Sequence, residues 1–64
     1  MKVHDIVKKI NYARAKQEVY IRTGWNEPRK LSSVEFENYF YDEKYCTVTS
    51  IDLEENRMII NYKM

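Results

Sequence analysis

Two runs rich in β-branched residues, each bordered by tyrosine, occupy the last third of the sequence and flank a polar segment. Residues 45–62 read YCTVTSIDLEENRMIINY, a pattern that predicts a β-hairpin. A three-residue loop made by residues 54–56 would pair Ile51 with Ile59, and Val48 with Tyr62. On this register the face of the hairpin directed to the core carries Cys46, Val48, Met58, Ile60 and Tyr62, interrupted by Ser50.

Apolar residues near the start of the sequence recur at helical spacing. They stand at positions i, i+3, i+4 and i+7, which predicts one buried stripe of an amphipathic helix: Val3, Ile6, Val7 and Ile10. We predict that this helix ends near Asn11. The good helix formers of residues 13–16 leave open an extension to about Lys16.

Residues 18–23 alternate between the two faces expected of a half-buried strand, with Val19 and Ile21 on one face and Tyr20 and Arg22 on the other. A dense turn signal follows, made by Gly24, Asn26 and Pro28. Residues 29–31 are then expected to return as a short strand, with Pro28 at its start or edge.

A second helix is predicted to begin at Ser32. Residues 32–35 read SSVE, the sequence of a capping box, and Leu31 and Phe36 stand where a hydrophobic staple would place them. The stripe of this helix would be Phe36, Tyr39 and Phe40, and its end is expected near residues 41–42.

The predicted elements alternate as helix, hairpin, helix, hairpin (αββαββ). We therefore expect a single α+β domain over residues 1–64, in which two helices cover one face of an antiparallel sheet.

The length and composition narrow the functional classes. A chain of 64 residues leaves little room for a buried substrate pocket. Its single cysteine excludes an internal disulfide, and the absence of a Cys/His cluster predicts neither a metal site nor a cofactor. No motif places a nucleophile or an acid/base pair, so an enzyme is not expected. Without an apolar run of membrane-spanning length or a signal peptide, we expect a cytoplasmic protein with no membrane partner.

Charge is unevenly distributed although the net charge is only +1. Residues 1–30 are basic and contain a stretch laced with aromatic residues: Lys8, Lys9, Tyr12, Arg14, Lys16, Tyr20, Arg22, Trp25, Arg29 and Lys30. Such a stretch suits nucleic acid, because cations meet phosphates and aromatic rings stack on bases. Tyr and Arg are also the residues that dominate binding at protein interfaces. Because no nucleic-acid-binding signature is present, binding to a protein is preferred over binding to nucleic acid. The contact residues expected are Tyr20, Arg22, Trp25, Arg29 and the acidic helix residues Glu35 and Glu37.

A homodimer is a third possibility. The predicted register puts Ile51 and Ile59 together on the hairpin face opposite Val48 and Ile60, where they would form an exposed apolar patch. A register slip of one residue would exchange the two faces and remove this patch.

Four segments in order, MKVHDIVKKI, EVYIRTG, SSVEF and VTSIDLEENRMII, resemble small uncharacterised proteins from phages and prophages of Gram-positive bacteria. The segment NYARAKQ departs from that pattern, being longer than the usual turn. The resemblance implies an accessory protein that binds a host or anti-phage defence protein, with inhibition of a CRISPR effector as one form. It carries over no catalytic or ligand residues.

Overall fold

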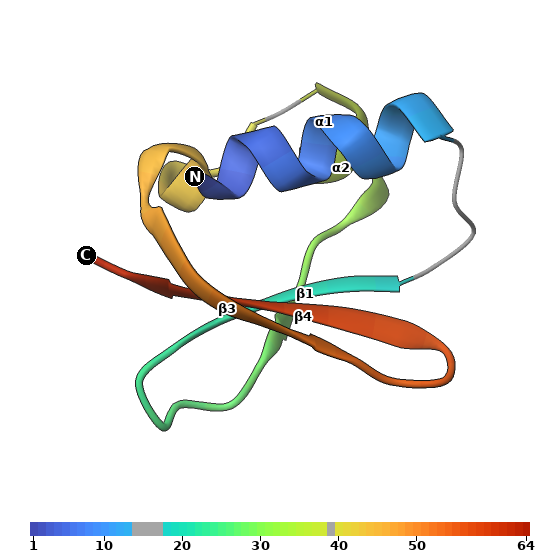
Figure 1. The fold of residues 1–64 in the computed structure, drawn as a ribbon. Helices are drawn as coiled ribbons and strands as arrows, with labels where there is room; N and C mark the ends of the chain where they lie inside the picture. Colours follow the sequence, from blue (N-terminus) through green and yellow to red (C-terminus); the bar gives the residue numbers. More distant parts are fainter. Residues whose placement is uncertain (14–17, 39) are drawn as a thin grey trace.

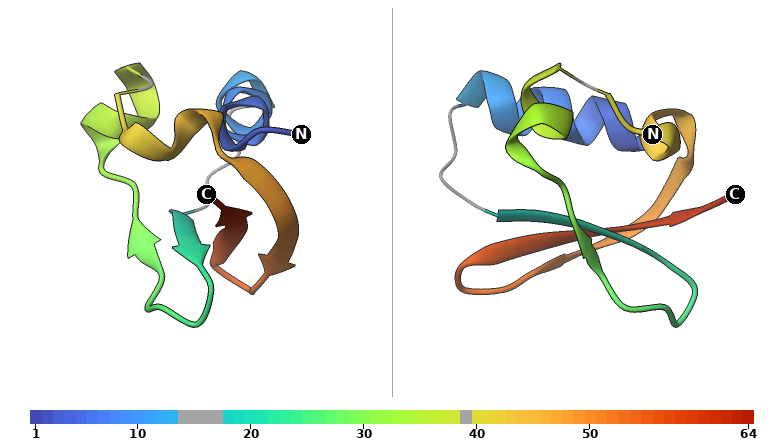
Figure 2. Two further views of the ribbon diagram at one scale, coloured as in Figure 1. Left: turned by 90° about the vertical axis from the view of Figure 1, so that its left-hand side faces the viewer. Right: turned by 180° about the vertical axis from the view of Figure 1, so that it is seen from behind.

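Two helices lie over one face of a four-stranded sheet in this computed structural model, which describes residues 1–13, 18–38 and 40–64 (Figures 1 and 2). Along the chain the elements are α1 (Val3–Ala13), β1 (Glu18–Thr23), β2 (Arg29–Lys30), α2 (Ser33–Asn38), the 3-10 helix η1 (Asp42–Tyr45), β3 (Thr47–Leu53) and β4 (Arg57–Lys63). A small α+β domain is thus confirmed. The sequence did not predict η1.

Helix α1 buries the stripe that its spacing predicts, made by Val3, Ile6, Val7 and Ile10. Its first turn is fixed by Asp5, whose carboxylate accepts a hydrogen bond from the backbone N–H of Lys2 at 3.0 Å. The helix runs to Ala13, past the end predicted near Asn11. The alternative end near Lys16 falls in residues 14–17, outside the described residues.

Strand β1 has the predicted bounds and buries Val19 and Ile21. The turn after it needs a left-handed residue, which Gly24 supplies with a φ of 60°. Strand β2 then pairs with β1 as the edge of the sheet.

The capping box before α2 is confirmed. The backbone N–H of Ser32 donates to the Glu35 carboxylate at 3.0 Å, and the N–H of Glu35 donates to Ser32 Oγ at 3.2 Å. The predicted apolar stripe is only partly correct. Phe36 packs against the core, Tyr39 lies outside the described residues, and Phe40 is exposed because α2 already ends at Asn38. Tyr41, in extended conformation before η1, is buried instead.

The β3–β4 hairpin forms, but the predicted three-residue loop is wrong. Glu54 N–H donates to the Arg57 carbonyl at 2.9 Å, which leaves a loop of two residues, Glu55 and Asn56. Ile51 consequently pairs with Ile60. An irregularity between Val48 and Ser50 absorbs the extra residue, so Val48 still pairs with Tyr62 as predicted.

The sheet is mixed, so the prediction of a purely antiparallel sheet was wrong. The strand order is β2-β1-β4-β3, and β1 pairs with β4 in parallel. Consecutive residues Ile59 and Ile60 of β4 are both buried, so this strand is covered on both faces and takes an interior position. Both of its edges are then paired, with β3 on one side and β1 on the other.

The core fills the space between the helices and the inner face of the sheet. The buried α1 stripe forms one core cluster with Ile21 and Ile60 of the sheet. The residues predicted for the inner face of the hairpin are partly buried and pack against this cluster: Cys46, Val48, Met58 and Tyr62. The N-terminal segment closes one end, where Val3 N–H donates to the Cys46 carbonyl and Val48 N–H to the Met1 carbonyl.

Candidate site on the outer face of the sheet

Three strands bring polar side chains together on the outer face of the sheet, the face turned away from the helices. Arg22 of β1 lies beside Asn61 of β4, and Asn61 lies opposite Ser50 of β3. Asp52 follows on the same face of β3, because alternate residues of a strand point to the same side. We call Arg22, Ser50, Asp52 and Asn61 the outer polar layer.

Hydrogen bonds hold these four side chains in one arrangement. Arg22 donates through Nε to Asn61 Oδ1 at 2.8 Å and through Nη2 to Asp52 Oδ2 at 2.7 Å. The Asn61 amide donates to Ser50 Oγ at 3.1 Å and to Asp52 Oδ2 at 3.0 Å. Because the side chains are already ordered, a partner that binds them loses little conformational entropy.

A hydrophobic residue lies under the polar surface. Ile59 is only 2% exposed although it points to the outer face, between Tyr20 on β1 and Asp52 on β3. The Arg57 guanidinium stands 4.9 Å from the centroid of the Tyr20 ring, and the Tyr20 hydroxyl donates to Glu18 at 3.1 Å. Tyr20, the neighbour of Ile59 on β1, is thus held by both Arg57 and Glu18.

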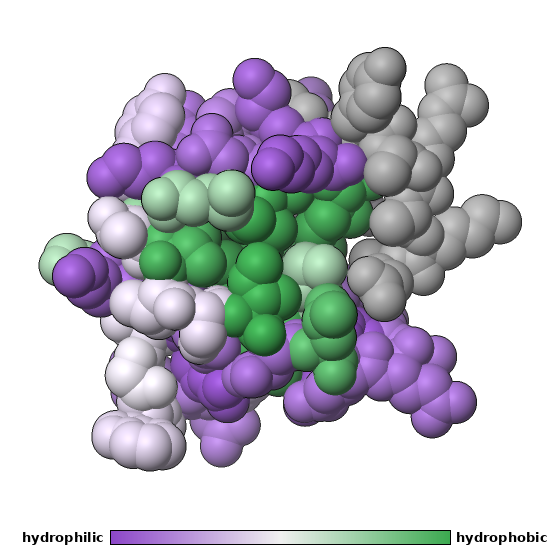
Figure 3. Space-filling model, viewed as in Figure 1, coloured by the Kyte–Doolittle hydropathy of each residue, from purple (hydrophilic) through white to green (hydrophobic). Residues whose placement is uncertain are grey.

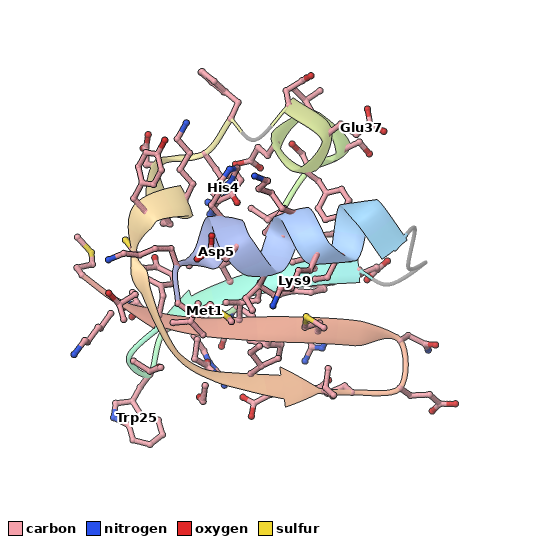
Figure 4. All side chains as sticks on the ribbon, turned by 45° about the horizontal axis from the view of Figure 1, so that its top comes forward. Met1, His4, Asp5, Lys9, Trp25 and Glu37 are labelled. Atoms are coloured by element: carbon pink, nitrogen blue, oxygen red, sulfur yellow. The ribbon has the colours of Figure 1, made fainter. Side chains whose placement is uncertain are left out.

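An open groove adjoins the outer polar layer, and Trp25 stands at its rim. The lining includes Thr23, the last residue of β1, and Trp25 of the β1–β2 turn, together with the outer polar layer. Trp25 is fully exposed, and Figure 4 shows it projecting from the turn away from the rest of the protein. A large exposed aromatic side chain beside ordered polar groups is an arrangement typical of recognition surfaces.

Arg29 and Glu35, also predicted as contact residues, lie in a different cluster. The Arg29 guanidinium binds the Glu35 carboxylate at 3.0 Å and the Glu43 carboxylate at 2.6 Å. Burial lowers the pKa of Arg29, but its hydrogen bonds and the charges of Glu35 and Glu43 outweigh burial, so the pKa is raised overall. The cluster links β2, α2 and η1, which gives Arg29 and Glu35 a structural role.

The six predicted contact residues therefore do not form one surface. Tyr20, Arg22 and Trp25 belong to the outer face and its turn, whereas Arg29 and Glu35 form the inter-element cluster. Glu37 is exposed on α2, and Figure 4 places it far from Trp25. Sequence reasoning missed Ser50, Asp52 and Asn61. Asn61 shares the face of Ile59 on either register, but only the two-residue loop puts Ser50 and Asp52 on that face as well.

Ion pairs neutralise much of the basic stretch. Arg22 binds Asp52, Arg29 binds Glu35 and Glu43, and Lys30 binds Glu18 at 3.3 Å. Lys8 and Lys9 are exposed on α1. Arg14 and Lys16 lie outside the described residues, as does the side chain of Tyr12. Arg22 and Lys30, the cations of this stretch on the outer face, thus already have carboxylate partners.

The apolar patch predicted from Ile51 and Ile59 does not exist. Ile59 pairs with Asp52 and is buried on the outer face, while Ile51 pairs with Ile60 and lies on the inner face. The physical reason is the one-residue shift that the shorter loop imposes on the tip of the hairpin. Ile51 and Ile59 therefore do not share a face, and the common apolar surface predicted for a dimer is not formed by these two residues.

Two further observations concern other classes of site. Within residues 1–13, 18–38 and 40–64, no group of three or more His, Cys, Asp and Glu side chains is placed to hold a metal ion. In the same residues, no helix is both long and apolar enough to cross a membrane.

Comparison of the chain with protein-family models, curated proteins and solved structures finds no match.

Proposed function

We propose that this protein is a non-enzymatic binding module that recognises another protein through the outer face of its sheet. The observation that carries the proposal is the fully exposed Trp25, which lines an open groove together with the outer polar layer. Trp and Arg dominate the binding energy of protein interfaces, because each combines a large contact area with directed hydrogen bonds.

The charged groups of the outer face support binding over catalysis. Asp52 is held by both Arg22 and Asn61, at 2.7 and 3.0 Å, so its carboxylate is already used as a hydrogen-bond acceptor. A general base needs a carboxylate oriented to a substrate proton. Asp52 instead orders Arg22, and an ordered guanidinium suits recognition of a carboxylate or carbonyl of a partner protein.

The sequence resemblance to small phage and prophage proteins supplies the class of partner. We extend the proposal accordingly to a host or anti-phage defence protein in the bacterial cytoplasm, for example a CRISPR effector, whose activity the bound module would block. A small domain bound to a functional surface of the partner would inhibit it by blocking that surface, and this mechanism requires no catalysis by the inhibitor.

A pull-down with matched variants tests this proposal. Tagged wild-type protein should recover a specific protein from lysate of a Gram-positive host, and Trp25→Ala should weaken that binding by about 30-fold, the effect of an interface hot spot. Phe40→Ala is the control, since Phe40 is an exposed aromatic residue away from the outer groove. Recovery of no specific protein, or equal recovery by wild type and Trp25→Ala, would contradict the proposal.

Nucleic-acid binding is the alternative, and the exposed Lys8 and Lys9 of α1 are what favours it. It is less well supported because the cations of β1 and β2 are paired with carboxylates. Binding to DNA or RNA that falls steeply with added salt, and that Lys8→Glu with Lys9→Glu abolishes, would establish this alternative.

A further inference from the structure

The free edge of β3 presents unpaired backbone groups. Strand β3 is last in the sheet order, and on its far side the described chain contacts it only near its start, through Met1 and Lys2. Glu54 directs its N–H to β4, so Asp52 does the same, since bonding direction alternates along an antiparallel strand. Ile51 and Leu53 therefore turn their N–H and C=O groups away from β4, toward the open edge.

Apolar side chains accompany this edge. Ile51 and Leu53 lie opposite Ile60 and Met58, on the inner face, yet they remain 38% and 70% exposed. Figure 3 shows apolar side chains gathered in a band between α1 and the β3–β4 hairpin. An edge strand that combines open hydrogen-bonding groups with exposed apolar residues is suited to pair with another strand.

We infer that β3 pairs antiparallel with β3 of a second copy of this chain, forming one continuous sheet across a two-fold axis at Asp52. Each Ile51 then lies opposite Leu53 of the second copy. The outward N–H and C=O groups of both residues are satisfied, and their side chains pack together beside the two α1 helices. An antiparallel strand edge is self-complementary, as a two-fold interface requires.

The position of the axis follows from what occupies the edge. Opposite residues must share a face, so the axis passes through a residue of the strand. An axis at Ile51 would set Glu54 against Val48 of the second copy, whose amide already binds Met1 at 2.8 Å. An axis at Leu53 would set Ile51 against Glu55 of the loop and leave it without an apolar partner. An axis at Asp52 pairs Ile51 with Leu53; it sets the two Asp52 carboxylates opposite each other, and each is neutralised by its own Arg22.

Charge complementarity indicates a second copy as the occupant. With the axis at Asp52, the acidic tip residues Glu54 and Glu55 of one chain approach the start of β3 in the other. Lys2 lies at that start, bridged to Thr47 with its Nζ 3.2 Å from Thr47 Oγ1. The two-fold axis creates this acid–base contact twice.

Sedimentation of the whole chain tests the inference. Wild type should pass from 7.8 kDa to twice that mass between about 10 μM and about 1 mM, the range expected for a small interface. Leu53→Lys should stay monomeric, because a lysine blocks edge pairing. Val34→Lys is the matched control and should still dimerise, since Val34 is a similarly exposed (62%) apolar residue on α2.

A charge exchange gives a second, independent arm that leaves the apolar residues intact. Lys2→Glu should weaken dimerisation by about tenfold, because the axis repeats the lost contact, and adding Glu55→Lys should restore it. The inference is overturned if wild type remains monomeric at about 1 mM, if Leu53→Lys dimerises like Val34→Lys, or if the double charge exchange fails to restore the dimer. It does not depend on the proposed function, because it uses the edge of β3 and leaves Trp25 out.

Discussion

Glu35 performs two tasks with one carboxylate. Its oxygens accept the backbone N–H of Ser32 and, at 3.0 Å, the guanidinium of Arg29. The hydrogen bond from Ser32 and the pairing with Arg29 lower the pKa of Glu35 below its ordinary value of 4.5. One residue therefore starts α2 and also ties that helix to β2.

Replacement of Glu35 by Gln separates the two tasks. The amide oxygen of Gln can still accept from Ser32, but the charge that binds Arg29 is lost. Because the folded-state pKa of Glu35 is depressed, its stabilising contribution is present above the unfolded pKa and disappears as the pH falls through the folded pKa. Glu35→Gln should therefore be less stable than wild type at pH 7 by less than about 1 kcal/mol, since the pair is largely solvent-screened.

Denaturant unfolding from neutral pH to about pH 3, below the ordinary carboxyl range, checks this expectation. The difference between wild type and Glu35→Gln should shrink toward zero at the acid end. Glu37→Gln is the control, because Glu37 is exposed on the same helix, and its effect should stay small throughout. A Glu35→Gln difference that is constant or grows on acidification would contradict the assignment.

At the scale of the element, the local features followed from the sequence and the non-local ones did not. The α1 stripe, the Ser32–Glu35 capping box and β1 depend on neighbours a few residues away, so pattern and spacing revealed them. The hairpin loop was misjudged by one residue, which put Ser50 and Asp52 on the wrong face. Asn61 was missed because the pairing of β1 with β4, which brings it beside Arg22, was not predicted. The consecutive apolar residues Ile59 and Ile60 could have predicted that this strand is buried on both faces, since neighbouring residues of a strand point to opposite sides.

The hairpin register can be tested with two isoleucines of the same hairpin. Ile59→Ala should destabilise the fold by about 2–4 kcal/mol, because Ile59 is buried between Tyr20 and Asp52. Ile51→Ala should change stability by less than about 1 kcal/mol, because Ile51 is partly exposed at the edge. Thermal or urea unfolding at low protein concentration measures both. Equal, small effects would instead indicate the three-residue loop, which leaves both residues on an exposed face.

For the whole molecule, the central contact is the parallel pairing of β1 with β4. It joins a strand from the first half of the sequence to the last strand, and the local sequence of neither strand indicates which strand it pairs with. This contact brings Arg22 next to Asn61, so the candidate site depends on a pairing that no short-range pattern could predict. The outer polar layer is consequently a property of the assembled sheet.

Amide hydrogen exchange followed by NMR examines both the sheet order and its free edge. Amides of β4 and β1 should exchange slowest, because these two strands are the interior strands of the sheet, whereas the outward amides of Ile51 and Leu53 should exchange quickly in dilute solution. Raising the protein concentration should slow those two amides selectively if β3 pairs with a second copy, and Leu53→Lys should abolish the slowing at Ile51. Fast exchange in β1 together with slow exchange confined to β3 and β4 would contradict the parallel pairing, since it would leave the hairpin as an isolated unit.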